Sequence, residues 1–265
     1  MPTEATYRIG APTRPTTITH DNGHLDQFPS RRPNRSDRLA YANWMMKLEG
    51  IEAVQGVPLA PKNDISDALA AYRHFMGASG TTRTIALDRY LANDRSGQIL
   101  LRNAKAEAME AAVELYDAVS ATGRSFRFTG SALQVSSQSL RWPYPATENW
   151  QKALGAFPFW LSGTVRVSPH PTDMRRDSFE MRFTIHMEDR YNFNPGEADI
   201  ATKIPDAANG RFEITGLARQ YMNVGTASRT VTWQRRDMPG QTEVAGGPDR
   251  RVRQPNDNRR VRNRL

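Results

Sequence analysis

The feature that most constrains this chain is the segment DSFEMRFTIHMED, residues 177–189, in which apolar and polar side chains alternate. Successive side chains of a strand point to opposite faces of a sheet, so this alternation gives one apolar and one polar face. The apolar set is Phe179, Met181, Phe183, Ile185 and Met187. The segment therefore predicts a strand with one face packed and the other face in water.

Mainly helices are predicted before residue 123, and mainly strands after it. Helix caps and apolar residues spaced three or four apart mark the helices, and short runs of β-branched and aromatic residues mark the strands. The expected helices span 37–49 (capped by Ser36), 65–76, 84–92, 103–121 and 148–155, the expected strands span 125–130, 163–169, 177–189 and 228–235, and residues 212–222 form a strand-to-helix passage or a short helix. This order favours an α+β fold, with N-terminal helices packed on a C-terminal, mainly antiparallel sheet.

The net charge of +8 is concentrated at the two ends of the chain. Seven arginines against one aspartate give +6 over residues 250–265, and five arginines against three acids give +2 over residues 1–35. Residues 36–249 are therefore formally neutral. Because phosphate contacts need positive charge on a folded surface, this neutral body argues against a plain nucleic-acid-binding module.

Composition also divides the chain into three regions. Residues 1–35 are rich in Pro, Thr, Arg and Asn, residues 236–265 are rich in Gly, Pro, Arg and Asn, and both lack apolar periodicity, which predicts a flexible N-terminal arm and a disordered Arg-rich tail. Between them we predict a single α+β domain over residues 36–235, helical over 36–122 and strand-rich over 123–235.

Several classes of protein are excluded at this stage. The chain has no cysteine, so disulfide frameworks and thiolate zinc sites are excluded. No apolar signal-peptide core is readable near the start, and no run of 18 apolar residues predicts a membrane span. We expect a protein that is cytoplasmic where it is made and that, if exported into target cells, leaves by a leaderless route.

Two short motifs resemble ligand sites but are better explained as loops. In HDNGH, His20 to His24, the two histidines have the spacing of a helical zinc motif, yet the Asn-Gly pair between them favours a turn. GASGTTR, Gly77 to Arg83, could present backbone N–H groups to a phosphate, but it lacks the ending that a P-loop requires. No metal and no cofactor is predicted.

The densest polar cluster follows the alternating strand, in HMEDRYNFNPGEADIATKIPD, residues 186–206. As an acid–base site, His186 would carry the proton, a carboxylate would orient it, and Arg190 would hold an anionic substrate group. The alternative is structural, since Asx side chains commonly hydrogen-bond the backbone of turns; a calcium loop fits poorly because the later oxygen ligands are out of register. The candidate catalytic residues are His186, Glu188, Asp189, Arg190 and Tyr191, and the candidate ligand or partner loop residues are Asn192, Asn194, Asp199, Asp206 and Glu213.

Two further groups have both a structural and a binding interpretation. The aromatic residues between Trp142 and Trp160 could stack on bases or lie at a membrane interface, but packing in the core is the favoured explanation. The basic tail could bind nucleic acid, an acidic partner or anionic lipid, or could be a solvated tail. Its arginines are Arg250, Arg251, Arg253, Arg259, Arg260, Arg262 and Arg264.

The phrase EDRYNFNPGEADIATKIPDAANGRFEITGLARQY, followed by GTASRTVTW, resembles an uncharacterised domain of bacterial polymorphic-toxin effectors associated with PAAR and Rhs delivery modules of contractile secretion systems. With ALAAYRHFMGASGTTRTIALDRYLANDRSG, the resemblance covers about residues 65–235. It implies a secreted or injected effector with an immunity protein, and it supplies no catalytic residues. The pattern departs from that family because no PAAR or Rhs repeat precedes the domain, so delivery would need a separate carrier.

Two function classes follow. The first is a bacterial effector or toxin-like domain of unknown activity, which leaves open whether the protein is an enzyme. The second is a non-enzymatic structural or cargo protein of a phage-like or injection particle, whose arms mediate assembly or contact nucleic acid. An effector predicts toxicity on expression, whereas a particle protein predicts self-assembly that is lost when an arm is trimmed.

Overall fold

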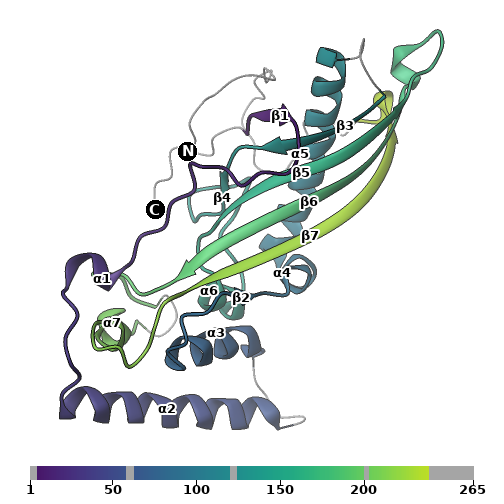
Figure 1. Cartoon of the computed structure of the whole chain (residues 1–265). Helices are drawn as coiled ribbons and strands as arrows, with labels where there is room; N and C mark the ends of the chain where they lie inside the picture. The colour runs from purple at the N-terminus through teal and green to yellow at the C-terminus, as the bar shows by residue number, and fades with distance from the viewer. Residues whose placement is uncertain (1–4, 58–62, 120–123, 200–202, 239–265) are drawn as a thin grey trace.

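The computed structural model describes residues 5–57, 63–119, 124–199 and 203–238. The predicted α+β class is confirmed: helices lie against one long, twisted sheet that is mainly antiparallel (Figure 1). The Arg-rich tail from residue 239 onward lies outside the described residues. Within those residues, no helix is both long and apolar enough to cross a membrane.

The sheet is built around the long central strands. Its order is β1-β3-β5-β6-β7-β2, with β4 paired to β5, and every strand pairing is antiparallel except that of β2 with β7. β6 and β7 pair along their whole length, from Ser178 opposite Gln234 to Tyr191 opposite Tyr221. The strands are β1 Tyr7–Ile9, β2 Arg83–Thr84, β3 Ser125–Gly130, β4 Leu133–Gln134, β5 Pro158–Ser168, β6 Ser178–Tyr191 and β7 Tyr221–Gln234.

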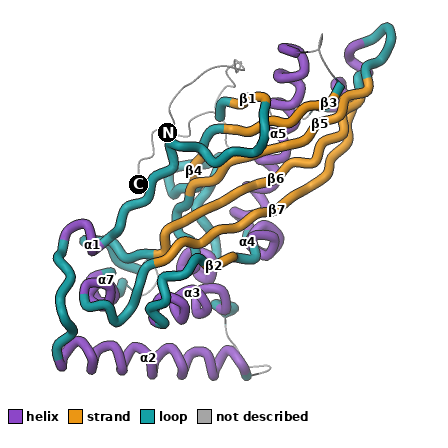
Figure 2. The backbone as a smooth tube through the Cα atoms, in the orientation of Figure 1, coloured by secondary structure: helices purple, strands orange, loops and turns teal. Residues whose placement is uncertain are grey.

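The helices occupy one face and one end of the sheet (Figures 1 and 2). The longest of them, α5, lies along the face, and α2, α3 and α7 gather beyond the end where β6 stops. The helices are α1 His24–Gln27, α2 Arg35–Gly56, α3 Ser66–Met76, α4 Leu87–Asn93, α5 Arg95–Val119, α6 Glu148–Ala153 and α7 Ala207–Ile214, with single 3-10 turns at Met174–Arg176 and Arg235–Asp237.

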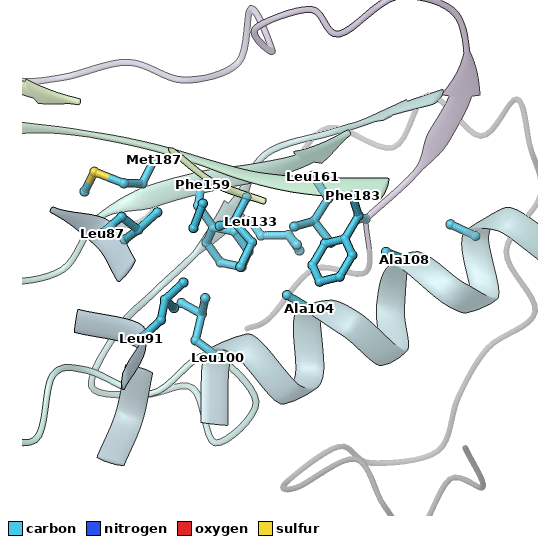
Figure 3. Packing of buried hydrophobic residues seen from close by; sticks show 14 of the residues in the cluster. Leu87, Leu91, Leu100, Ala104, Ala108, Leu133, Phe159, Leu161, Phe183 and Met187 are labelled. Carbon is cyan, nitrogen blue, oxygen red and sulfur yellow. The ribbon is translucent and has the colours of Figure 1, made fainter. Parts of the chain in front are cut away.

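The main core lies between α5 and the sheet. Small residues of α5, among them Ala104 and Ala108, face the apolar side chains of β5 and β6 such as Leu161 and Phe183 (Figure 3). All four are fully buried. Alanine on the helix lets its backbone approach the large side chains of the strands, which favours close packing of this face.

The aromatic residues predicted to be core are mostly core. Trp142, Trp150, Phe157 and Phe159 all belong to the main cluster, and Trp160 is buried in a smaller one on the other face of the sheet. The packing interpretation of this aromatic group is therefore the one that the structure supports.

In the N-terminal segment, where the sequence predicts a flexible arm, β1 joins the edge of the sheet and the Tyr7 hydroxyl donates to Glu107 of α5, while residues 13–20 lie on the opposite face of the sheet from α5. β1 pairs with β3, and Thr13 exchanges hydrogen bonds with Thr129, its N–H donating to Oγ1 over 3.3 Å. Farther along, Ile18 is buried against Ala132 and Trp160 in the smaller cluster. These contacts use side chains on distant strands, which is why the local composition of the segment does not indicate them.

Several predicted element boundaries differ from the structure, and three of the differences have a cap or a partner as their cause. α2 is capped by Asn34 and Asp37 in a reciprocal capping box, so Ser36 lies inside the helix. α5 begins at Arg95, eight residues before the predicted helix start, because the Asp94 carboxylate accepts hydrogen bonds from the N–H groups of Ser96 (2.8 Å) and Gly97 (3.3 Å). β7 begins seven residues before the predicted strand start because its whole length pairs with β6.

Candidate functional site at the end of β6

The candidate site lies where β6 ends, because from His186 onward this strand carries polar side chains on both of its faces. Its core-side face continues with Asp189 and Tyr191, while its other face carries His186, Glu188 and Arg190. The N-terminal segment covers the second face, and α7 together with residues 192–199 and 203–206 closes the end of the strand (Figure 1). The site thus draws on segments far apart in the sequence.

Glu188 is held by two partners from the N-terminal segment, the Arg14 guanidinium and the His20 imidazole. Its carboxylate accepts hydrogen bonds from Arg14 Nε at 2.8 and 3.0 Å and lies 2.9 Å from His20 Nε2. Burial by itself would raise the pKa of Glu188, but the hydrogen bonds from His20 and Arg14, with the charges of both, lower this pKa to about 2. Glu188 is therefore an ionised anchor for the segment, with its oxygens already engaged.

His186 is held in place by ring packing and by one hydrogen bond. Its ring stacks on Trp160, with centroids 5.0 Å apart and planes 9° apart, and its Nε2 lies 2.8 Å from Ser162 Oγ. Burial lowers the pKa of His186 below the ordinary value for histidine, so the imidazole is neutral near pH 7. The predicted proton carrier thus bonds a serine on β5, with its ring flat against a tryptophan.

The end of the strand is joined to the N-terminal segment by a set of polar contacts. Arg190 Nη1 donates to Asn22 Oδ1 over 2.7 Å, and Asn192 Nδ2 donates to Asp21 Oδ1 over 2.6 Å. The N–H of His24 donates to the Phe193 carbonyl over 3.1 Å. Gly23, the residue before it, has a φ of 55°, in the left-handed region, and a Cβ there would collide with the same carbonyl. This close approach requires glycine.

Asp189 differs from its neighbour Glu188 in having no cation beside it among the described residues. It is buried on the core side, where the amide Nδ2 of Asn223 on β7 lies 3.4 Å from its Oδ2. Burial raises the pKa of Asp189 to about 8; the Asn223 hydrogen bond opposes this rise, and the nearby charge of Asp21 adds to it. Asp189 is therefore protonated at neutral pH and can donate a proton.

Glu213 on α7 is the second buried carboxyl of the site. It is only 5% exposed, and neither carboxyl oxygen has a hydrogen-bond partner of good geometry among the described residues. Burial and the charges of Asp21 and Asp206 raise the pKa of Glu213 to about 8, against the lowering effect of the Arg190 charge and of the Gln220 backbone. The charge of one aspartate, Asp21, thus acts on both protonated carboxyl groups, those of Asp189 and Glu213.

His24 supplies a neutral imidazole to the same environment. The residue is 3% exposed, its ring stacks on Phe28 at 5.6 Å, and it fills the space above Gly210 of α7, where any Cβ would collide with it. Burial lowers the pKa of His24, while the charge of Asp206 opposes that shift. Its Nε2 is buried without a hydrogen-bond partner in the described structure. A neutral imidazole has one unprotonated ring nitrogen, and that nitrogen can accept a proton.

The loop after β6 links these groups to the rest of the domain. Asp206 Oδ2 accepts the N–H of Asn194 over 3.0 Å, and burial raises the pKa of Asp206. Asp199 lies 3.4 Å from Lys152 of α6. Tyr144 lies within electrostatic range of Asp189, Asp199 and Asp206, and burial raises its pKa as well.

The predicted residues therefore fall into two groups. Asp189, Arg190, Asp206 and Glu213 lie within electrostatic reach of Asp21 or of one another. His186 and Glu188 are engaged on the other face, Tyr191 stacks on Tyr221 at 5.1 Å, and Asn192 bonds the N-terminal segment in place of the turn predicted for it. Sequence reasoning missed Asp21, His24, Tyr144 and Asn223. HDNGH contains the first two, but its pattern indicates only a metal motif or a loop.

The two histidines of HDNGH point to different partners, His20 to Glu188 and His24 to α7, and the second of them begins α1. Among the described residues, no group of three or more histidine, cysteine or acidic side chains is placed to hold a metal ion. Asn209 and Gly210 lie within α7, where Asn209 Oδ1 accepts a hydrogen bond from the hydroxyl of Tyr72 over 2.7 Å.

No family model and no curated protein matches the chain. Among solved structures, a match is found to PaeM, a colicin M-like bacteriocin produced by Pseudomonas aeruginosa, with a TM-score of 0.36 and 12% sequence identity. The match covers 63% of this chain and 51% of that chain, so it spans about half of the bacteriocin. A likeness at this level does not establish a common fold or a common function.

Proposed function

We propose that this chain is a toxin-like bacterial effector that catalyses a hydrolysis or group transfer by general acid–base chemistry at the end of β6. The observation that carries the proposal is the Glu213 carboxyl, buried on α7 with no hydrogen-bond partner of good geometry among the described residues and with a pKa raised to about 8. A buried carboxyl without compensation destabilises its fold, and such groups concentrate at functional sites. The resemblance of residues 65–235 to polymorphic-toxin effectors supports the biological role.

The proton chemistry follows from the environments of three groups. Glu213 and Asp189 hold their protons at pH 7 and can donate one to a leaving group, whereas His24 is neutral and can accept one from an attacking water or hydroxyl. One proton is given and one is taken, so the net charge of the site is unchanged by the reaction. The Arg190 guanidinium would hold an anionic group of the substrate.

The finer parts of the proposal concern delivery and partners. An effector of this kind requires a carrier into the target cell and an immunity protein in the producing cell. Its immunity protein would cover the end of β6, because blocking Arg190 and the two protonated carboxyls would stop the chemistry. The basic tail would serve the carrier or an acidic partner.

Growth of bacteria that express the chain, in cytoplasmic and periplasm-directed forms, tests the proposal. We expect growth arrest in one compartment by the wild type and relief of that arrest by Glu213→Gln and by Asp189→Asn. Both changes are nearly isosteric and remove a group whose ionisation opposes folding, so loss of toxicity would not reflect unfolding. Glu180→Gln, on the exposed part of β6, is the matched control and should remain toxic.

Arrest by all four proteins would disprove this site while leaving the toxin-like role. Harmless wild-type expression in both compartments, with soluble folded protein, would disprove the effector proposal and favour the particle alternative. Self-assembly of that protein, lost on trimming residues 1–35 or 236–265, would then identify the particle role.

A further inference from the structure

The helix α2 has two different faces, and only one of them is used within the domain. Its inner face packs on α3 and α7: the Tyr41 hydroxyl donates to the Met76 carbonyl over 2.7 Å, and its ring meets Phe212 edge to face at 5.7 Å. Leu48 on the same helix is 2% exposed. α2 lies at the bottom of the molecule in Figures 1 and 2, with its other face turned away from α3, α7 and the sheet.

The outer face of α2 is largely apolar although it is exposed. Leu39 and Met46 are each 63% exposed, Val54 is 53% exposed and Val57, just after the helix, is 50% exposed. Spaced at 3.6 residues per turn, these side chains form one stripe along the helix, opposite Leu48. Between them the stripe holds only small or uncharged residues, all exposed, namely Ala42, Asn43, Gly50 and Ala53. A surface helix normally carries charges on such a face, so this stripe indicates a surface that something covers.

The cations beside the stripe are exposed. Arg32, Arg35 and Arg38 lie at the start of α2, and Lys47 borders the stripe with its Nζ 4.6 Å from the centre of the Trp44 ring. These groups place positive charge along the border of an aliphatic surface.

The acids of α2 are mostly neutralised within the domain. Asp37 binds Arg31 and Arg211, and Glu52 binds Arg73. Glu49 is exposed, and its charge acts on the same Arg73. The charge left for a partner of this face is therefore mainly positive.

We propose that α2 docks on the surface of an anionic lipid bilayer, lying in the plane of the interface. An aliphatic stripe fringed by Arg and Lys is the pattern of interfacial amphipathic helices: the stripe enters the boundary of the acyl chains, and the cations reach the lipid phosphates. The helix lies on the membrane and does not cross it. Exposed Leu, Met and Val side chains are buried in lipid, and the rest of the domain stays on the water side.

Two other occupants fit less well. A second copy packed face to face would place the same cationic fringe on both sides of the contact, so like charges would meet. Residues 239–265 of the same chain contain only four large apolar residues, Val244, Val252, Val261 and Leu265, among seven arginines. That composition does not match an aliphatic stripe bordered by cations.

Flotation of the full chain with lipid vesicles tests this proposal. Vesicles of phosphatidylglycerol and phosphatidylcholine should bind the wild type, and pure phosphatidylcholine vesicles should bind it much less. Leu39→Glu/Met46→Glu should weaken binding to the anionic vesicles by about a hundredfold, because two large apolar contacts are lost and two negative charges are added. Leu140→Glu/Met174→Glu, at positions 76% and 65% exposed outside α2, adds the same charge and should bind far better than the α2 variant.

The basic tail could bind anionic vesicles by itself, so the comparison is repeated at about 0.5 M salt, where the Debye length falls to about 4 Å. Binding through the stripe should persist there better than binding through the tail. Equal binding by the α2 variant and the control variant would overturn the proposal. A wild type that does not bind vesicles would also overturn the proposal. The same holds if that wild type is a dimer in solution and the α2 variant is a monomer. Glu213→Gln should bind vesicles like the wild type, so failure here is distinguishable from failure of the acid–base site.

Discussion

The two halves of β6 direct their side chains alternately to the same two faces but differ in what those faces carry and in what covers them. From Ser178 to Thr184, the apolar residues pack on α5, while Glu180 and Arg182 are exposed. From His186 to Tyr191, polar residues lie on both faces and none is fully exposed to water, because the N-terminal segment covers one face and α7 closes the end. The first half is a structural strand, and the second half is a buried polar site within the same strand.

Two adjacent carboxyl groups show what this difference does. Glu188 faces Arg14 and His20, and its pKa falls to about 2; Asp189 faces the core, where the structure describes no cation beside it, and its pKa rises to about 8. One residue step along a strand reverses the side on which a carboxyl lies, and here that reversal separates an ionised anchor from a protonated acid. Side-chain chemistry in this half is decided by the partner on each face.

The largest expected effect lies in the first half. Phe183→Ala removes a fully buried ring that packs over α5 and should lower the free energy of unfolding by about 4 kcal/mol, because it leaves a cavity. Denaturant titration measures this loss. Its neighbour on the exposed face provides the control, since Arg182→Ala should change the same quantity by less than about 0.5 kcal/mol. Similar losses in both variants would contradict the one-sided character of this half.

In the second half, Asp189→Asn should stabilise the protein increasingly as the pH rises. The native pKa of Asp189, about 8, lies above its ordinary value of 3.8, so the stability that its proton provides is complete below pH 3.8 and is lost as the pH rises through 8. Asparagine removes that dependence, and the difference between variant and wild type should grow by about 3 kcal/mol between pH 4 and pH 7. Unfolding titrations across this range measure it, and a constant difference would show that Asp189 ionises normally.

The opposite pH dependence of stability is expected when Arg14, the partner of Glu188, is removed. Arg14→Ala should cost about 1.5 kcal/mol at pH 7, an amount reduced by the partial exposure of Arg14, because a buried carboxylate loses the guanidinium that pairs with it. The stability from the low pKa of Glu188 is present above pH 4.5 and lost as the pH falls through 2, so the cost should fade in acid. Thermal melts at pH 7 and pH 2.5 separate this from a packing effect, which would persist at both.

The smallest expected effect concerns the packing of the His24 ring against α7. Gly210→Ala places a methyl group against the imidazole and should cost about 1 kcal/mol, because the ring and its segment must shift. Protection of the Asn22 to His24 amides against hydrogen exchange should fall as well. Gly216→Ala, in an open turn on the same side, has a positive φ but no neighbour for its Cβ, and should leave that protection unchanged. Equal protection in both variants would mean that His24 does not anchor the segment.

Much of the fold follows from local pattern. The alternation of 177–189 and the apolar spacing in 65–76 predict elements that form, and the grouping of helices before strands predicts the α+β class. The predicted boundaries are wrong where a distant partner extends an element, as pairing with β6 extends β7, or where the sequence pattern does not indicate a cap, as at Asp94. For the candidate site, the sequence predicts Asp189, Arg190, Asp206 and Glu213 because acidic and basic residues gather at the end of the strand and after it, and their role stays a prediction.

The sequence by itself determined that residues 186–191 would present polar groups on both faces of a strand, because side-chain direction in a strand depends only on position. Only the tertiary structure decided which of these groups form hydrogen bonds or ion pairs and which have a raised pKa. That outcome depends on Arg14, His20 and Asp21 from one end of the chain meeting β6, and on the burial of Glu213 without a hydrogen-bond partner in the described part of the chain. Charge and burial act through space, so the same carboxyl is an anchor or an acid according to neighbours that its own segment does not contain.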